Sequence, residues 1–268
     1  MKHLSKYIED LQANGKRAFT FEEAKNALNG SNASIKSSLY RIKQKGEIVD
    51  LLKGYYLIIP PEYRILGCLP PDQVVPLIMG HLKLEYYVGL LSAAMYYGAS
   101  HQKPQVFQVI TKKQFRPLQC GQTKIQFIVK KDLEKIPVQT KTVPTGYLII
   151  SSPEATAMDL FLYPKSSGGL NHIATILSEL VEELNADKLI KLSKKINEIS
   201  WIQRLGYLLE TIEPFDKEKT DSIIIQLKKY INSLNPKIIP LHWNFPKKWK
   251  EKNEVWRIIV NTTVESDL

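Results

Sequence analysis

The stretch NASIKSSLYRIKQKGEIVDLLKGYYLII, residues 32–59, decides the fold of the N-terminal part of the chain. Its first half predicts a short basic helix, because apolar residues recur at a spacing that places them on one helical face. This face contains Ile35, Ser38, Leu39 and Ile42. Gly46 predicts the end of the helix, since glycine readily adopts the left-handed conformation that follows a last turn.

The second half of the stretch predicts a tight β-hairpin. Residues 47–51 and 55–59 are rich in β-branched, aromatic and aliphatic side chains. They flank Leu52, Lys53 and Gly54, which we expect to form a three-residue loop with Gly54 at positive φ. Lys53 would then lie at the tip of the hairpin.

The side of the helix opposite its apolar face carries polar and basic residues. These are Lys36, Ser37, Tyr40, Arg41, Lys43 and Gln44. Arginine and glutamine can form bidentate hydrogen bonds to base edges in the major groove of DNA, and lysine, serine and tyrosine suit phosphate contacts. The composition of this side is therefore typical of a helix that reads duplex DNA.

Two further helices are predicted before the basic helix, over residues 1–13 and 20–28. Thr20 and Glu23 have the spacing of a capping box, and Asn29-Gly30 predicts the turn that follows. Three helices and a hairpin in this order predict a winged helix-turn-helix domain over residues 1–60. Two alternatives stay open: any amphipathic helix has a charged solvated side, and helix-turn-helix units also mediate protein contacts.

The chain is too long for this domain alone. Its 268 residues are 44% hydrophobic, and this predicts a second core of ordinary size. The net charge of +10 is not confined to the N-terminus: residues 1–80 contain 11 Lys+Arg and 8 Asp+Glu, and the remainder contains 26 and 19. A diffuse positive charge favours nucleic acid or an acidic protein as partner.

Cys68 and Cys120 are expected to be buried free thiols in a reducing cytoplasm, because a chain of this size needs no disulfide. The N-terminus MKHLSKYIED has no apolar segment typical of export signals. No run approaches the roughly 20 apolar residues that span a bilayer. We therefore expect a cytoplasmic protein that does not contact a membrane.

Prolines at 60, 61, 70, 71 and 76 predict a linker over residues 61–80 in which regular structure is broken. The second domain is expected over 81–268. Its mixed α/β part, to about residue 165, should contain a helix over 85–97, strands over 105–111, 124–129 and 147–150, and a helix over 152–161. The expected fold class is α+β and mainly helical, with a winged helix-turn-helix before this small sheet.

From residue 170 onward the pattern is helical. Helices are predicted over 170–184, 187–196, 201–212 and 217–234, which together form a helical array packed on the small sheet. Residues 255–260 alternate in the manner of a strand, which we expect to return to this sheet or to pair at its edge.

Four segments resemble the AbiEi-type antitoxins of type IV, abortive-infection toxin-antitoxin systems. They are LYRIKQKGEIVDLLKGYYLI at 39–58, EYYVGLLSAAMYYGASHQKPQVFQVIT at 85–111, SPEATAMDLFLYP at 152–164 and GGLNHIATILSEL at 168–180. The first is common to many winged-helix proteins. The second and third are more specific, because a helix ending in YYG before a strand and a PExTAxDL helix ending in YP are similar to the hallmarks of the family.

The resemblance implies a repressor of its own operon that binds inverted repeats in duplex operator DNA. It also implies an antitoxin that neutralises a nucleotidyltransferase-like toxin, commonly without a stable complex. DNA contacts are carried over to Lys36, Arg41, Lys43 and Lys53, where the family tends to be basic. Nothing functional is carried over to residues 213–268.

An enzyme is the first alternative, and its candidate carboxylates are Glu154 and Asp159. They are five residues apart on a predicted helix and so about 140° apart around its axis, which does not suit shared acid/base work. Glu154 is expected to be a first-turn carboxylate stabilised by the helix N-terminus. Asp159 is expected to be half-buried and bonded to an arginine or to the backbone. The other alternative is a protein-interaction module whose helical array binds an acidic partner.

No catalytic residue, metal site or cofactor is predicted. The five histidines form no HxxxH or HExxH pattern, and no Walker or dinucleotide-binding sequence is present. The Gly168-Gly169 pair suits either a phosphate-binding turn or, more simply, a flexible connection.

Two basic segments outside the N-terminal domain form a possible secondary nucleic-acid or partner surface. The first, residues 111–131, has six basic and no acidic residues, and the second, 245–256, interleaves lysine with tryptophan. The residues singled out are Lys112, Lys113, Arg116, Lys247, Lys248 and Trp249. Such mixtures suit stacking on bases and contact with phosphates, although lysines also protect the exposed edges of sheets.

Overall fold

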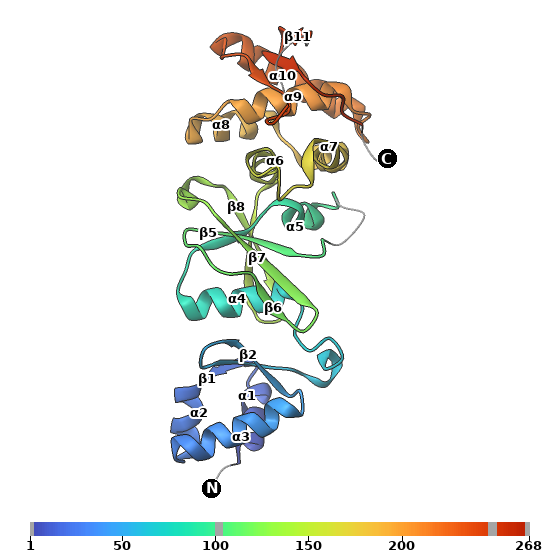
Figure 1. The fold of residues 1–268 in the computed structure, drawn as a ribbon. Coiled ribbons are helices and arrows are strands. Elements are labelled where there is room, and N and C mark those ends of the chain that lie inside the picture. Colours follow the sequence, from blue (N-terminus) through green and yellow to red (C-terminus); the bar gives the residue numbers. More distant parts are fainter. Residues whose placement is uncertain (1–2, 100–103, 246–250, 266–268) are drawn as a thin grey trace. The chain divides into compact units, whose positions relative to one another are not determined.

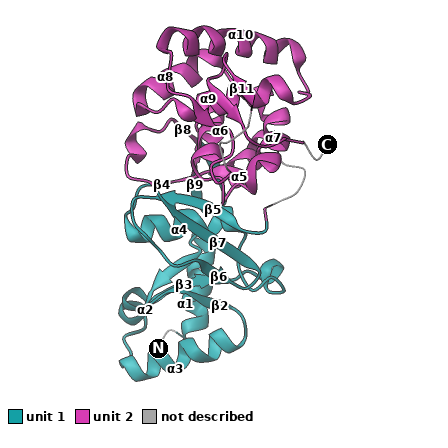
Figure 2. Ribbon diagram, turned by 45° about the horizontal axis from the view of Figure 1, so that its top comes forward, with its two compact units in different colours: residues 1–86, 105–129, 140–148 teal, residues 87–104, 130–139, 149–268 magenta. Residues whose placement is uncertain are grey.

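The computed structural model describes residues 3–99, 104–245 and 251–265. The fold is mixed α and β, with α-helices and three sheets in the described part of the chain (Figure 1). The chain divides into two compact units (Figure 2). Unit 1 comprises residues 1–86, 105–129 and 140–148, and unit 2 comprises 87–104, 130–139 and 149–268.

Residues 3–60 of unit 1 form three helices and a small antiparallel sheet. The helices are α1 (Leu4–Ala13), α2 (Phe21–Leu28) and α3 (Asn32–Gln44), and the strands are β1 (Ala18–Thr20), β2 (Ile48–Leu52) and β3 (Tyr55–Ile58). The strand order is β1-β3-β2. The predicted capping box is confirmed: Thr20 accepts from the backbone of Glu23, and the Glu23 carboxylate accepts from the backbone of Thr20 at 2.6 Å.

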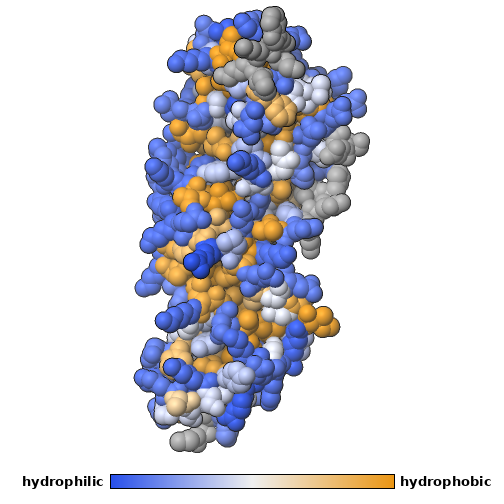
Figure 3. All heavy atoms as spheres, in the orientation of Figure 1, coloured by the Kyte–Doolittle hydropathy of each residue, from blue (hydrophilic) through white to orange (hydrophobic). Residues whose placement is uncertain are grey.

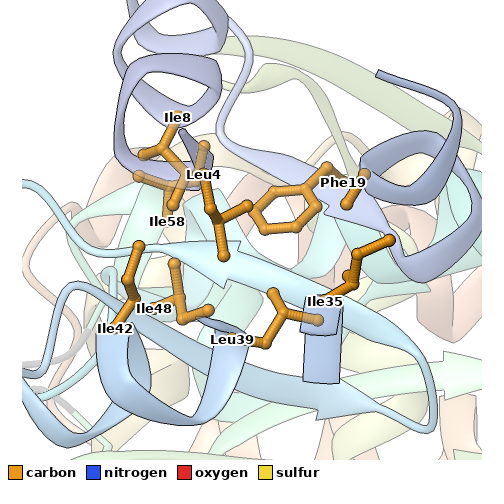
Figure 4. Packing of buried hydrophobic residues seen from close by; sticks show 9 residues of the cluster. Leu4, Ile8, Phe19, Ile35, Leu39, Ile42, Ile48 and Ile58 are labelled. Atoms are coloured by element: carbon orange, nitrogen blue, oxygen red, sulfur yellow. The ribbon is translucent and has the colours of Figure 1, made fainter. Parts of the chain in front are cut away.

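A single hydrophobic cluster holds these elements together (Figure 4). The predicted apolar face of α3 is confirmed, because Ile35, Leu39 and Ile42 are all buried in it. The other helices and the sheet contribute Leu4, Ile8, Phe19, Ala24, Ile48 and Ile58. Burying the apolar face fixes the rotation of α3, so its polar side must face solvent.

The hairpin is tighter than predicted. Leu52 pairs with Tyr55, so the loop has two residues, Lys53 and Gly54, with Gly54 at φ +75°. The prediction placed Leu52 in the loop, because the sequence does not show the irregular register between Asp50 and Leu52. This shift in register lets Leu52 pair with Tyr55 and remain in the strand.

The proline-rich segment contains more regular structure than predicted. A short 3₁₀ helix spans Pro61–Tyr63, and α4 spans Pro71–Leu82 with Pro76 inside it. Pro71 is the first helical residue, where its missing N–H removes no hydrogen bond. The expectation that prolines interrupt structure here was wrong because α4 buries Val74, Val75 and Ile78, and this burial offsets the cost of Pro76.

The largest sheet has the strand order β6-β7-β5-β4-β9-β8. Its strands are β4 (Tyr86–Val88), β5 (Phe107–Thr111), β6 (Leu118–Cys120), β7 (Thr123–Val129), β8 (Val138–Val143) and β9 (Gly146–Ser151). Within unit 1, β7 pairs parallel with β5 and antiparallel with β6. The strands predicted over 105–111, 124–129 and 147–150 are confirmed, with small differences in their ends.

The helix predicted over residues 85–97 was wrong in its first half. Tyr86–Val88 form β4, where Val88 pairs with Ile150 of β9 in parallel. Gly89 follows, and only then do α5 (Leu90–Ala94) and a 3₁₀ turn (Met95–Tyr97) begin. The prediction failed here because a buried strand is also a continuous run of apolar residues, which the spacing alone does not distinguish from a helix.

The helices predicted from residue 152 onward are confirmed. They are α6 (Pro153–Leu162), α7 (Gly169–Leu180), α8 (Ala186–Ile196), α9 (Ser200–Thr211) and α10 (Lys217–Leu234), with a 3₁₀ turn at Val181–Glu183. α6 contacts α7, α8 and α9, and α9 contacts α10. Nine of the ten residues of α6 are buried, which makes it the central helix of the array.

The tail does not join the large sheet, contrary to expectation. β10 (Ile239–Pro240), β11 (Glu251–Asn253) and β12 (Ile258–Val260) form a separate sheet with β12 in the middle. Helix α9 explains this arrangement, because Gln203 donates to the carbonyls of Trp256 and Arg257. The Trp256 ring lies against Gly206, where a Cβ atom would be 2.0 Å from it.

The two cysteines form a disulfide between residues 68 and 120, whose Cα atoms are 5.6 Å apart. The expectation of free thiols was wrong because the fold, and not the spacing in sequence, brings these segments together. Gln122 donates a backbone hydrogen bond to Leu66, and at Gly121 a Cβ atom would be 2.1 Å from the Leu66 carbonyl oxygen. Only glycine permits this close approach.

No helix in the described ranges is long and apolar enough to cross a membrane.

Replacing both cysteines should destabilise unit 1. The disulfide closes a long loop in the unfolded chain, so Cys68→Ser with Cys120→Ser is expected to lower the free energy of unfolding by about 2–4 kcal/mol. Urea denaturation of the purified proteins measures the change. Thiol titration of the denatured, unreduced wild type should find no reactive thiol, and two reactive thiols would contradict the disulfide.

Candidate nucleic-acid interface

The polar side of α3 is fully open to solvent. All seven residues predicted to contact DNA are exposed: Lys36, Ser37, Tyr40, Arg41, Lys43, Gln44 and Lys53. Tyr40 is a large aromatic residue with 64% of its surface accessible. In the view of Figure 3, hydrophilic residues gather at the lower end of the molecule, where α3 lies. The geometry thus brings the residues of α3 to one exposed face and keeps Lys53 at the hairpin tip.

Some of these side chains already have ion-pair or hydrogen-bond partners within the protein. Lys43 forms an ion pair with Asp50 of β2, and Arg41 donates to the Ser38 hydroxyl at 3.3 Å. Among the described residues, Lys36 and Lys53 form no ion pair or side-chain hydrogen bond. Lys36, Lys53 and Arg41 are therefore the cations of this face with the most freedom to contact a phosphate or a base.

The first secondary basic segment is partly neutralised. Lys112 forms an ion pair with Glu85 at 2.9 Å, while Lys113 and Arg116 are exposed. Lys130, counted with this segment, has only 12% of its side chain exposed and pairs with Asp159. The other predicted residues, Lys247, Lys248 and Trp249, lie outside the described residues.

Asp159 is the centre of a buried polar cluster in unit 2. The side chain is completely buried, and one carboxylate oxygen accepts from the Tyr87 hydroxyl at 2.8 Å and the other from Lys130 Nζ at 2.7 Å. The Lys130 ammonium also lies 5.5 Å from the centre of the Tyr163 ring. The expectation of a half-buried Asp159 bonded to arginine or backbone was wrong, because its partners come from segments 29 and 72 residues away.

Burial dominates the titration of this cluster. It raises the pKa of Asp159, whereas the charge and hydrogen bond of Lys130 and the hydrogen bond from Tyr87 lower it. Burial and the nearby carboxylate also raise the pKa of Tyr87, and they raise the pKa of Tyr163 to about 12. Both phenols therefore stay protonated near neutral pH, and Tyr87 acts as a hydrogen-bond donor.

Glu154 does not share a site with Asp159. It lies in the first turn of α6, as predicted, but it is 98% buried and accepts from the Ser152 hydroxyl at 2.9 Å. Glu154 and Asp159 therefore have different hydrogen-bond partners, as expected from the angle between them around the axis of α6.

The described histidines have packing contacts or lie at the surface. His81 stacks on Tyr55 with ring centres 4.0 Å apart, and His242 stacks on Phe245 at 3.9 Å. Within the described ranges no group of three His, Cys, Asp or Glu side chains is placed to hold a metal ion.

A family model supports the sequence resemblance. Residues 87–211 match the model described as the AbiEi antitoxin C-terminal domain, which confirms the resemblance over this part of the chain. The resembling segment 39–58 lies outside the match. The matched region contains Tyr87, Lys130 and Asp159, so the buried cluster lies within it. No curated protein matches the chain.

Two solved structures match the chain. The RV2827C protein from Mycobacterium tuberculosis matches with a TM-score of 0.64 and 16% identity, over 95% of this chain and 90% of the other. This likeness shows a shared fold. An antigenic nucleotidyltransferase-like protein from Paracoccidioides brasiliensis matches with a TM-score of 0.35 and 12% identity, over 58% and 90% of the two chains, which is too low to carry an argument.

Sequence reasoning missed the role of Lys130, which it counted as a surface cation. It also missed the lysines on one face of α8, Lys188, Lys191 and Lys195. Their spacing of three and four residues is visible in the sequence and predicts one shared helical face. No sequence signal pairs Lys130 with Asp159.

The buried pair yields a prediction with a defined pH dependence. Lys130→Met should lower the free energy of unfolding by about 3–5 kcal/mol at pH 8, because it leaves the Asp159 carboxylate buried without its cation. The folded variant would hold a proton on Asp159 that the unfolded chain releases, so its stability falls as the pH rises above the ordinary pKa of aspartate. The loss should therefore be smaller at pH 5.

Urea denaturation at pH 5 and pH 8 measures both effects. Lys131→Met removes the same charge from an exposed neighbour and is the matched control. Equal losses for the two variants, or a loss independent of pH, would contradict the proposed role of Lys130.

Proposed function

We propose that the chain is a DNA-binding repressor of its own operon and the antitoxin of a nucleotidyltransferase-like toxin. Residues 1–60 would be the winged helix-turn-helix domain, 61–80 the connection and 81–268 the antitoxin domain. The observation that carries the DNA-binding proposal is the exposed side of α3, with Lys36, Arg41 and the wing residue Lys53 free of acidic partners.

The mode of binding follows from the orientation of α3. Its buried face is held by the N-terminal core, so its polar face enters the major groove of an inverted-repeat operator while the β2–β3 hairpin lies against the backbone. Arg41 and Gln44 would read base edges, and Lys36, Ser37, Tyr40 and Lys53 would contact phosphates. Lys43, which already pairs with Asp50, would contribute less.

The antitoxin proposal is supported by the match of residues 87–211 to an AbiEi antitoxin domain. We propose a type IV, non-enzymatic antitoxin in which neutralisation proceeds without a stable complex with the toxin. The buried hydrogen-bonded setting of Asp159 supports a structural role for this carboxylate.

The proposed location is the cytoplasm, where both operator and toxin would be found. Disulfides are rare in that compartment. Rapid alkylation of thiols in intact cells, followed by mass spectrometry, would show whether Cys68 and Cys120 are paired there.

Operator binding tests the first half of the proposal. A mobility-shift titration with the upstream region should show salt-sensitive binding that is at least about a thousandfold tighter than to a scrambled duplex. Arg41→Ala should weaken operator binding by about 1–3 kcal/mol and relax specificity at one position. Arg64→Ala, an exposed arginine outside α3, is the matched control. Equal, weak binding of wild type to both duplexes would refute the repressor proposal.

Toxin neutralisation tests the second half. Cells that express the neighbouring toxin should grow when the wild-type chain is co-expressed from an independent promoter. Arg41→Ala should rescue growth as well as wild type does, because the substitution changes only the DNA-binding face. Failure of the wild-type chain to rescue growth would refute the antitoxin proposal without affecting the DNA-binding result.

A further inference from the structure

Unit 2 contains a pocket that the proposed function does not use. It is formed by α6, α8 and the start of β8, which all belong to this unit (Figure 2), and α6 contacts α8. Its volume is about 400 Å³, within the range of about 300–1,000 Å³ typical of small-molecule sites. The residues that matter here are Ser152, Glu154, Lys188, Lys191, Leu192 and Lys195.

Three lysines give one wall of the pocket a positive charge. Lys188, Lys191 and Lys195 lie on one face of α8 and are exposed. In the described part of the chain, none of their ammonium groups has an ion-pair partner. Glu154 is the single acidic residue of the lining. An anionic group that enters the pocket would therefore meet several uncompensated cations.

Glu154 places a second, independent requirement on a ligand of this pocket. Its carboxylate is 98% buried at the N-terminal turn of α6, where the helix dipole favours a negative charge. The Ser152 hydroxyl donates to Oε2, but Oε1 has no hydrogen-bond partner among the described residues. An unsatisfied buried acceptor is costly. Glu154 lines the pocket, so a ligand that brings a hydrogen-bond donor would lower this cost once the side chain turns Oε1 toward it.

We propose that this pocket binds a nucleoside phosphate. The phosphate groups would contact the lysines of α8, and an N–H or O–H group of the base or ribose would donate to Glu154 Oε1. A bare anion satisfies the lysines but is repelled by Glu154, and a basic peptide satisfies Glu154 but is repelled by the lysines. A nucleoside phosphate carries both the anion and the donor in one small molecule that fits a concave site.

Titration calorimetry on the full-length chain tests the proposal with ATP, GTP, CTP and UTP, and with tripolyphosphate as the probe that lacks a nucleoside. At least one nucleotide should bind with a Kd below about 1 mM and at least about tenfold more tightly than tripolyphosphate. Lys191→Gln with Lys195→Gln should weaken nucleotide binding by about tenfold or more. Lys194→Gln with Lys229→Gln removes the same charge from outside the pocket and should leave the Kd within about twofold.

Glu154→Gln isolates the role of the carboxylate, because it preserves the shape of the side chain. The ratio of the nucleotide and tripolyphosphate affinities should fall by about tenfold, while binding of tripolyphosphate is retained or strengthened. Circular dichroism and the unfolding transition confirm that each variant is folded.

Three results would overturn the assignment. They are the absence of binding for all four nucleotides at about 1 mM, equal affinity for tripolyphosphate and every nucleotide, and equal weakening by the pocket and control lysine variants. Operator binding and toxin neutralisation are measured separately, so the outcome does not depend on the proposed function.

Discussion

The structure of unit 2 depends on one buried interaction, the contact of Asp159 with Lys130 and Tyr87. Burying a carboxylate is costly unless its oxygens are paired, and here a hydroxyl and an ammonium group pair with both oxygens of Asp159. Tyr87 belongs to β4, Lys130 follows β7 directly in sequence, and Asp159 lies on α6. The pair therefore fixes where three separate segments meet around the most deeply buried helix of the unit.

The sequence predicted the parts of the fold that depend on local pattern. The apolar spacing of α3, the capping box of α2 and the helices from α6 to α10 were all predicted, because each rests on residues within about one turn of each other. The seven residues expected on the exposed side of α3 and at the hairpin tip are exposed for the same reason. In an amphipathic helix, burial of the apolar side determines which residues of the opposite side are exposed to solvent.

Features that depend on partners far along the chain were not predictable in this way. Residues 86–88 are a strand because Val88 pairs with a residue 62 positions later, and Cys68 is oxidised because Cys120 is folded against it. The tail forms its own sheet because two residues of α9 hold Trp256. Gln203 donates a hydrogen bond to its backbone carbonyl, and Gly206 leaves room for its ring. In the candidate sites, the ion pair of Lys130 with Asp159 likewise joins residues that are 29 positions apart, so no spacing rule could find it.

Net charge alone does not distinguish cations that have carboxylate partners from cations that do not. Of the basic residues considered for nucleic-acid contact, Lys43, Lys112 and Lys130 each have a carboxylate partner, so a large formal excess overstates the charge that a ligand meets. What distinguishes Lys36 and Lys53 on the N-terminal face, and Lys188, Lys191 and Lys195 on α8, is the lack of such partners in the described structure. Lys36 and the lysines of α8 lie on exposed sides of helices whose opposite sides are buried. The positions of unpaired cations are therefore a better basis for proposing an anion-binding surface than the composition of the chain.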